Sequence, residues 1–319
     1  MAVFTEVSAF DAQALLQRLG LGGLQQISGI KAGIENSNFF VDCEGGRFVL
    51  TLFERLSHAE LPFYLGLMQH LASKGLPVPA PQADAEGQTL FTLAGKPAAL
   101  VNRLSGGHQL APDVFHCEQL GETLARMHQA VSDFPLHQPN LRGLAWWQDT
   151  APRVLPHLSE ELAALLRDEL AFQHSCAAQV SLLPQGAIHA DLFRDNAMFE
   201  GLPGREQLCG VFDFYFAGVD SFLFDLAVCL NDWCIDLHSG ALVEARALAL
   251  VRAYETVRPL SGAEHRLLPA LLRAAALRFW LSRLFDWHCP REASLLKPHD
   301  PSHFERVLQQ RRAIAFHAV

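Results

Sequence analysis

The pattern of apolar residues changes once along the chain, near residue 102, and this change constrains the fold more than any other feature. Before it, short apolar segments are separated by glycine turns, which is typical of β-strands and hairpins. From residue 113 onward, apolar residues recur at helical spacing over long segments. The 319 residues are enough for two domains of about 100–200 residues each. We therefore expect an α+β chain with a small antiparallel-sheet N-lobe over residues 1–102 and a mostly helical C-lobe over residues 103–319.

Glycines and prolines mark the ends of the predicted N-lobe elements. Glu44-Gly45-Gly46 favours a hairpin between two strands, and Gly75 followed by Pro77 indicates the end of a helix. The predicted order is a helix at 8–19, strands at 25–31, 37–43 and 47–53, a helix at 59–73, and strands at 89–93 and 96–102. This order favours an antiparallel sheet with a helix packed on it.

The C-lobe is predicted to be helical except for one segment, residues 187–216. The expected helices lie at 113–130, 159–180, 221–235, 241–257, 263–288 and 302–316. Ser261 and Glu264 have the spacing of a capping box, in which each side chain bonds a free backbone N–H at the start of a helix. We expect the reactive residues of the lobe in this non-helical segment.

Composition excludes several classes of partner. The net charge of −9 and the pI near 5.9 argue against binding to nucleic acid or to anionic membranes. The sequence contains no apolar run of about 18 residues and no basic N-terminal region, so we expect neither a membrane span nor a signal peptide. The seven cysteines are scattered and include no Cys-x-x-Cys pair, which favours free thiols in a cytoplasmic protein.

The non-helical segment carries a carboxylate, an amide and a second carboxylate. It reads His189-x-Asp191-x-x-x-x-Asn196, followed after a turn by Asp213. Apolar residues on both sides of the turn predict a hairpin, which would place Asn196 and Asp213 at the same end of the sheet. Phosphoryl transfer needs such groups, because a carboxylate can align the attacking hydroxyl while hard oxygen ligands hold Mg²⁺. We expect Asp191 to accept or aim the hydroxyl proton and His189 to brace the loop.

The same motif, followed by an apolar residue, Asp and Phe, resembles the aminoglycoside phosphotransferase and choline kinase superfamily. More narrowly, the chain resembles the bacterial homoserine kinases of that superfamily, in the stretches Gly33–Val41, Phe48–Glu54, Leu141–Leu144 and Ile188–Phe199. The resemblance implies a bilobal protein-kinase-like fold. It also implies phosphoryl transfer, with ATP and Mg²⁺, to the side-chain hydroxyl of L-homoserine, a step of threonine biosynthesis.

The resemblance also implies roles for individual residues. Asp191 would be the catalytic base, and Asn196 and Asp213 the magnesium ligands. The nucleotide would be bound by a turn between the first two strands, by the third strand and by a hinge at residues 101–104. The implied nucleotide-binding residues are Gly33, Ser37, Asn38, Thr51, Val101 and Arg103.

Two features depart from the pattern of protein kinases. Gly29 and Gly33 have a G-x-x-x-G spacing in place of G-x-G-x-x-G. Thr51 stands where the third strand normally carries a lysine for the α and β phosphates, so Glu60, the early acidic residue of the next helix, has no such lysine to hold. The sequence leaves three substitutes open, namely Lys31, Arg55 or a second Mg²⁺.

The acceptor site is predicted to lie in the C-lobe beside Asp191. An amino acid needs a cation for its carboxylate, and the sequence leaves Arg194 and Arg283 as alternatives. Further acceptor contacts are expected on or before the helix that follows Asp213, namely Asp220, Asn231, Asp232 and Trp233. Asp225 on that helix is expected to hold the catalytic loop.

Other functions remain open from the sequence. The tryptophans Trp233, Trp280 and Trp287 allow an aromatic cage for choline, although their helical spacing favours core packing. An aminoglycoside or another amino alcohol is an alternative acceptor. A nucleotide-binding, pseudokinase-like module would explain the missing lysine, but the complete set of Asp191, Asn196 and Asp213 argues against it.

Overall fold

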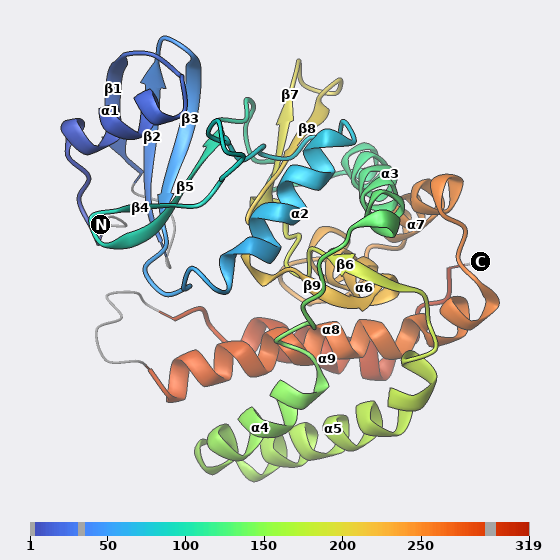
Figure 1. The fold of residues 1–319 in the computed structure, drawn as a ribbon. Coiled ribbons are helices and arrows are strands. Elements are labelled where there is room, and N and C mark those ends of the chain that lie inside the picture. The colour runs from blue at the N-terminus through green and yellow to red at the C-terminus, as the bar shows by residue number, and fades with distance from the viewer. Residues whose placement is uncertain (1–3, 31–35, 291–297, 319) are drawn as a thin grey trace. The chain divides into compact units, whose positions relative to one another are not determined.

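The computed structural model describes residues 4–30, 36–290 and 298–318 (Figure 1). The chain forms two compact units. The N-terminal unit comprises residues 1–107, 134–136 and 209–212, and the C-terminal unit comprises residues 108–133, 137–208 and 213–319. Gly33, for which the resemblance implies a nucleotide contact, and Lys31, one of the open substitutes for the missing lysine, lie outside the described residues.

The N-terminal unit contains the small antiparallel sheet that the sequence predicts. Five strands lie in the order β1-β2-β3-β5-β4, and each neighbouring pair is antiparallel. The predicted hairpin is confirmed, because Cys43 pairs with Gly46 across the turn. The elements are α1 (Ala9–Arg18), β1 (Leu24–Gly29), β2 (Ser37–Cys43), β3 (Gly46–Leu52), α2 (Leu61–Ser73), β4 (Phe91–Leu93) and β5 (Lys96–Asn102).

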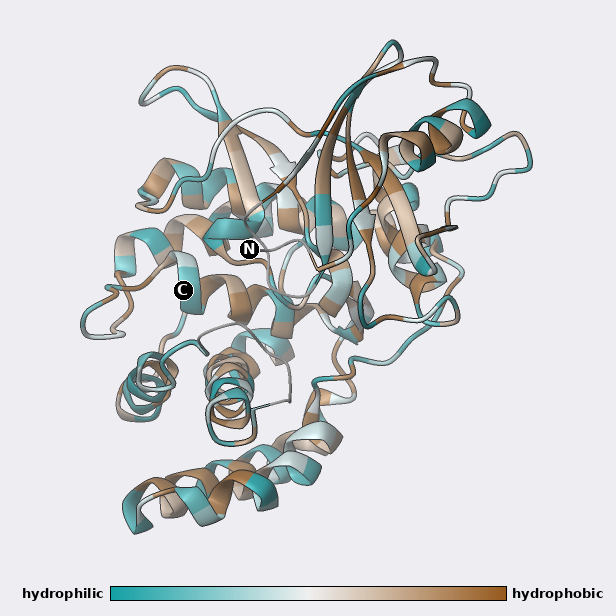
Figure 2. Cartoon of the chain, turned by 90° about the vertical axis from the view of Figure 1, so that its left-hand side faces the viewer, coloured by the Kyte–Doolittle hydropathy of each residue, from teal (hydrophilic) through white to brown (hydrophobic). Residues whose placement is uncertain are grey.

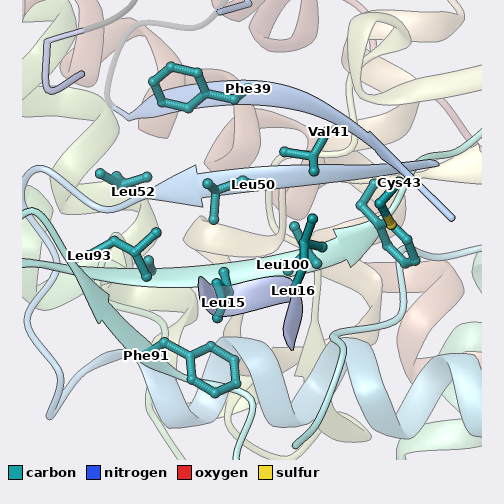
Figure 3. Packing of buried hydrophobic residues seen from close by; sticks show 12 residues of the cluster. Leu15, Leu16, Phe39, Val41, Cys43, Leu50, Leu52, Phe91, Leu93 and Leu100 are labelled. Carbon is teal, nitrogen blue, oxygen red and sulfur yellow. The ribbon is translucent and has the colours of Figure 1, made fainter. Parts of the chain in front are cut away.

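Alternating apolar residues give this sheet its core. Along β2, Phe39, Val41 and Cys43 point to the same side, because successive strand residues face opposite sides. They join apolar residues of β3, β4 and β5, and Leu15 and Leu16 of α1 close the cluster (Figure 3). Full burial of one such leucine contributes roughly 1.5–3 kcal/mol. Figure 2 accordingly shows the strands of this sheet mostly in brown, the colour of hydrophobic residues.

The C-terminal unit is mostly helical, as predicted. Helix α3 packs on α7, α8 packs on both α6 and α9, and α4 lies beside α5 (Figure 1). In Figure 2 these helices carry brown and teal stripes, as expected of amphipathic helices with one buried side. Their bounds are α3 (Val114–Ala130), α4 (Leu144–Val154), α5 (Glu160–Val180), α6 (Phe222–Trp233), α7 (Glu244–Val257), α8 (Gly262–His288) and α9 (Ser302–Ala313).

The sequence predicted these helices incompletely. Helix α4 was not predicted, and Pro152 in its last turn argues against a helix there when only the sequence is considered. The capping box at Ser261 and Glu264 is confirmed, and Asp113 and His116 form another at the start of α3. None of the described helices is both long and apolar enough to cross a bilayer.

Two short strand pairs build the predicted non-helical segment. Strands β7 (Ala197–Glu200) and β8 (Gln207–Val211) pair with each other, and a connection this short requires an antiparallel hairpin. The predicted hairpin is therefore confirmed, with Asn196 directly before β7 and Asp213 just after β8. Strands β6 (Gln185–Ile188) and β9 (Gly218–Ser221) form an antiparallel pair that the sequence did not predict.

Candidate active site

The loop that carries Asp191 begins where β6 ends, within the C-terminal unit. Ala190, directly before Asp191, has a φ of +63°, and Asp213 has a φ of +66°. Non-glycine residues rarely adopt this left-handed conformation, and it persists only where the surrounding structure enforces it. The predicted base Asp191 and the predicted magnesium ligand Asp213 thus lie in segments with an unusual local backbone.

Asp225 in the first turn of α6 enforces the conformation of this loop. Its fully buried carboxylate accepts hydrogen bonds from the backbone N–H of His189 at 2.9 Å and of Ala190 at 2.7 Å. Burial alone would raise the pKa of Asp225, but hydrogen bonds from His128 and from the loop lower it below its ordinary value. Asp225 is therefore an anion that fixes the two residues preceding Asp191.

A chain of buried hydrogen bonds in turn holds Asp225. His128 Nε2 lies 3.0 Å from Asp225, and His128 Nδ1 lies 2.7 Å from the hydroxyl of Tyr254. The Tyr254 hydroxyl accepts a bond from Arg258, which also pairs with Glu264 of α8. A carboxylate only accepts, so Nε2 donates to Asp225 and Nδ1 accepts the Tyr254 proton. Burial lowers the pKa of His128 and keeps the ring neutral in this tautomer.

His189 lies inside the loop that it was expected to brace. Its ring is buried against Phe214, with the ring centroids 4.5 Å apart. Its Nδ1 accepts a hydrogen bond of 3.3 Å from the backbone N–H of Asp191. Together with the Asp225 contacts, this bond engages the backbone N–H groups of three consecutive residues, 189–191.

Asp191 is surrounded by charges. Its side chain is 16% exposed, and Nη1 of Arg278 lies 3.7 Å from its Oδ1. Burial is the largest cause that raises the pKa of Asp191 to about 8; Arg278 opposes the shift, whereas Asp213 and Asp195 add to it. The negative charge of Asp213 is thus one of the causes that favour the protonated form of Asp191.

Asn196 and Asp213 fit a hard divalent cation. Nδ2 of Asn196 donates a 2.8 Å bond to the carbonyl of Asp191, which leaves its side-chain oxygen as the acceptor atom. Asp213 is exposed and supplies carboxylate oxygens. In the described part of the chain, no three His, Cys, Asp or Glu side chains form a metal-binding group. A donor set this small suits Mg²⁺, which usually keeps several waters and phosphate oxygens as ligands.

The residues predicted to bind the acceptor mostly bond the protein itself. Arg194 donates from its backbone and from Nε to Asp232, and its two terminal nitrogens donate to the carbonyls of Leu110 and Asp232. Trp233 is fully buried and donates to the carbonyl of Leu192. The remaining predicted contacts have these partners: Asn231 bonds Leu272 and Arg311, Asp220 accepts from Asn140 and Ser221, and Arg283 donates to the Asp300 carbonyl and lies over Phe304.

The three tryptophans considered for a choline cage do not share one surface. Trp233 and Trp280 are fully buried, whereas Trp287 is 45% exposed. The aromatic cage is therefore not formed by these residues, and Trp233 and Trp280 belong to the core, as their helical spacing suggested.

The side chains predicted to bind the nucleotide lie in the N-terminal unit. The buried hydroxyl of Ser37 donates to Glu54 and accepts from the backbone of Phe4 and Thr5. Thr51, at the position of the missing lysine, donates a 2.7 Å bond to Asn38.

The predicted hinge residues and the charged residues of the N-terminal unit contact other residues of that unit. In the predicted hinge, Val101 pairs with Val49, and Arg103 lies over the ring of Phe40. Glu60 accepts hydrogen bonds from Ser57. Lys96 of β5 forms an ion pair with Glu54, at 3.3 Å, which the sequence did not predict.

Sequence reasoning missed three residues around Asp191, namely Arg278, His128 and Tyr254. His128 and Tyr254 are separated from Asp225 by many residues, and no local pattern connects them. Arg278 lies in the same stretch of α8 as Arg283, which the sequence leaves as a candidate for binding the acceptor carboxylate. Five residues turn a helix by 500°, so the two side chains point about 140° apart, and the sequence does not say which of them faces Asp191.

The chain matches a known protein family. Residues 26–260 match the model of the phosphotransferase enzyme family. The chain is 60% identical to a homoserine kinase of Polaromonas naphthalenivorans over 98% of both chains. It is 54% identical to one of Burkholderia mallei, over 99% of this chain and 97% of the relative.

Solved structures show the same fold at low sequence identity. An amicoumacin kinase has a TM-score of 0.67 at 17% identity, covering 95% of this chain and 93% of that one. A choline kinase of Cryptosporidium parvum has a TM-score of 0.60 at 15% identity, covering 90% and 89%. These neighbours confirm the predicted fold class, a protein-kinase-like chain with a small antiparallel sheet and a helical part.

Proposed function

Because the chain belongs to the phosphotransferase enzyme family and aligns along nearly its whole length with homoserine kinases, we propose that it is an ATP-dependent homoserine kinase. It transfers the terminal phosphoryl group of ATP to the side-chain hydroxyl of L-homoserine, a step of threonine biosynthesis. The observation that carries this proposal is the near-complete alignment with homoserine kinases of two bacteria, which includes the loop of Asp191 and Asn196.

In this proposal Asp191 aligns the homoserine hydroxyl and accepts its proton. The raised pKa of Asp191, about 8, suits a group that takes up a proton near neutral pH. The attack needs a fixed direction, and the bonds from Asp225 and His189 to the loop supply it. Asp225, His128 and His189 are positioning residues in this scheme.

Asn196 and Asp213 are the residues that would hold Mg²⁺. Both offer oxygen atoms near Asp191, and the Asn196 amide is oriented by its bond to the Asp191 carbonyl. A bound Mg²⁺ neutralises phosphate charge during transfer. The role of the chain is to present these oxygens on a hairpin whose two ends are fixed.

The nucleotide is proposed to bind to the N-terminal unit through its backbone. Gly33, Asn38 and the hinge at Val101 and Arg103 are the proposed contacts. Ser37 and Thr51 support them indirectly, since their hydroxyls are bonded to Glu54 and Asn38. This arrangement fits a chain that has threonine in place of the usual strand lysine.

We place the enzyme in the cytoplasm. All seven cysteines are free thiols, and Cys117 and Cys234 lie with their sulfur atoms 3.9 Å apart inside the core. Such buried thiols are typical of proteins in a reducing compartment.

An acceptor screen tests the proposed function. Purified protein is incubated with ATP, Mg²⁺ and, in separate reactions, L-homoserine, choline, ethanolamine and an aminoglycoside, and products are identified by mass. We expect the highest kcat/KM for L-homoserine, with a product heavier by one phosphoryl group. Faster transfer to choline or to an aminoglycoside would identify that compound as the acceptor. ATP binding without any transfer would support a pseudokinase-like module.

A further inference from the structure

Arg278 is a buried cation beside the proposed catalytic base, and its hydrogen bonds are incomplete. Its side chain is 4% exposed. The 3.7 Å between its Nη1 and Asp191 Oδ1 is too long for a direct hydrogen bond. Its Nη2 is fully buried and has no hydrogen-bond partner among the described residues.

Other buried arginines of this unit differ from Arg278. Arg194 bonds Asp232, and Arg311 bonds Asn231 and a carbonyl. Burying an unpaired guanidinium nitrogen costs free energy, because the group loses its water without gaining a partner. A buried donor left over next to a reacting group therefore points to a ligand that completes its bonds.

Two aromatic rings hold the Arg278 guanidinium in place. Its central carbon lies 3.8 Å from the ring centroid of Phe279 and 5.0 Å from that of Phe216. Such cation–π contacts orient the plane of the group and limit its motion. Arg142 lies over the same Phe216 ring, so positive charge is concentrated there. A planar, fixed guanidinium is the natural partner of a carboxylate, which it can bind through two parallel hydrogen bonds.

We propose that Arg278 binds the carboxylate of the acceptor and so selects an amino acid over a simple amino alcohol. This inference rests on the proposed function, because it takes Asp191 as the group that meets the acceptor hydroxyl. In L-homoserine the hydroxyl and carboxylate groups are about 5 Å apart when the carbon chain is extended. This separation suits a hydroxyl on Asp191 and a carboxylate on Nη2 of Arg278, since the two side chains are neighbours.

The two arginines chosen from the sequence are less suited to this role. All the nitrogens of Arg194 that could form a fork already have partners in Asp232 and Leu110. Arg283 donates to the Asp300 carbonyl and lies over Phe304. Arg278 combines burial, a fixed plane, a donor without a protein partner and direct proximity to Asp191.

A comparison of two acceptors tests the proposal. The second acceptor is 3-aminopropan-1-ol, which is homoserine without its carboxylate. For the wild-type enzyme we expect kcat/KM to be about 10²–10³-fold higher for L-homoserine, because a charge-assisted pair is lost with the analogue. This measurement needs no variant, and equal values for the two acceptors would overturn the proposal.

Variants locate the effect on Arg278. Arg278→Gln should lower kcat/KM for L-homoserine about 10²–10³-fold more than it lowers kcat/KM for 3-aminopropan-1-ol, with the KM for ATP unchanged. The kcat/KM of Arg278→Lys for L-homoserine should lie between the values of the wild type and of Arg278→Gln, because lysine keeps the charge but cannot form two parallel hydrogen bonds. The matched control is Arg266→Gln, an exposed arginine on the same helix, which should leave both acceptors unaffected.

Each remaining outcome has a distinct meaning. Equal losses on both acceptors would show that Arg278 only balances the charge of Asp191, and a selective loss in Arg283→Gln but not in Arg278→Gln would assign the carboxylate to Arg283. Either result overturns the inference while the proposed function stands. Failure of the wild-type enzyme to phosphorylate L-homoserine at all would instead overturn the proposed function.

Discussion

The polar groups of the two units are organised differently. In the C-terminal unit, the carboxylates of Asp225 and Asp232 reach across from α6 and bind backbone N–H groups of the catalytic loop. In the N-terminal unit, Ser37 and Thr51 bond neighbouring side chains, and sheet pairing sets the backbone. The proposed reacting groups are thus placed by buried polar side chains, whereas the proposed nucleotide segment is placed by strand register. Side-chain substitutions should therefore be far more damaging in the first region than in the second.

Removal of the proposed base is the strongest test of this contrast. Asp191→Ala should lower kcat by about 10²–10⁴-fold, the usual contribution of a positioned acid–base group. The KM for ATP should change little, since ATP is proposed to bind to the other unit. Steady-state kinetics measure both constants. The matched control is Asp195→Asn, which changes an exposed carboxylate of the same loop and should lower kcat less. A variant that retains most of its kcat would remove Asp191 from the role of base.

Neutralising Asp213 probes the proposed metal site next to that base. Asp213→Asn keeps the size of the side chain and removes its charge, so the Mg²⁺ concentration for half-maximal activity should rise by about ten- to a hundredfold. A magnesium titration at saturating ATP and homoserine measures the shift. An unchanged titration curve would show that Asp213 does not hold the metal.

The buried chain behind the catalytic loop should contribute mainly to stability. Tyr254→Phe removes the proton donated to the buried His128 and one acceptor of Arg258, at a cost of about 1–3 kcal/mol in the free energy of unfolding. Urea unfolding measures this loss. The double variant with His128→Gln should lose less than the sum of the single losses, because both residues act through one chain of bonds. Additive losses would mean that Tyr254 and His128 are independent.

The smallest effect is expected in the N-terminal unit. Thr51→Val removes one neutral hydrogen bond to Asn38 and should raise the KM for ATP by about three- to tenfold, with kcat nearly unchanged. The same kinetic assay measures it. A loss as large as that of Asp191→Ala would mean that Thr51 contacts the phosphates directly, and the contrast between the two units would disappear.

The general fold was predictable because its signals are local. Glycine turns and alternating apolar residues gave the hairpin of β2 and β3, and helical spacing with a capping box gave α8. Helix α4 was missed because Pro152 lies in it. The pair of β6 and β9 was missed because its strands are short and about thirty residues apart, so no turn signal joins them.

The site was predictable only where one short segment carries it. Asp191 and Asn196 share a loop, and Asp213 follows after a single hairpin. The partners that fix this loop are distant in sequence, since His128 lies 97 residues from Asp225. Arg278 and Arg283 lie in the same apolar stretch of α8, and only the packing of the helix shows which of them faces Asp191. Long-range packing decides these cases, and a single sequence does not encode it in a readable local pattern.

Helix α8 contributes residues to two places in the C-terminal unit, the buried hydrogen-bond chain that supports the loop of Asp191 and the surroundings of Asp191 itself. Glu264 in its first turn binds Arg258, the last member of the chain that supports the catalytic loop, and Arg278 stands beside Asp191. Fourteen residues separate them, or about 21 Å along the axis. With Arg278 as the proposed carboxylate ligand, a substitution at this position would alter acceptor choice without weakening the anchor at the beginning of the helix.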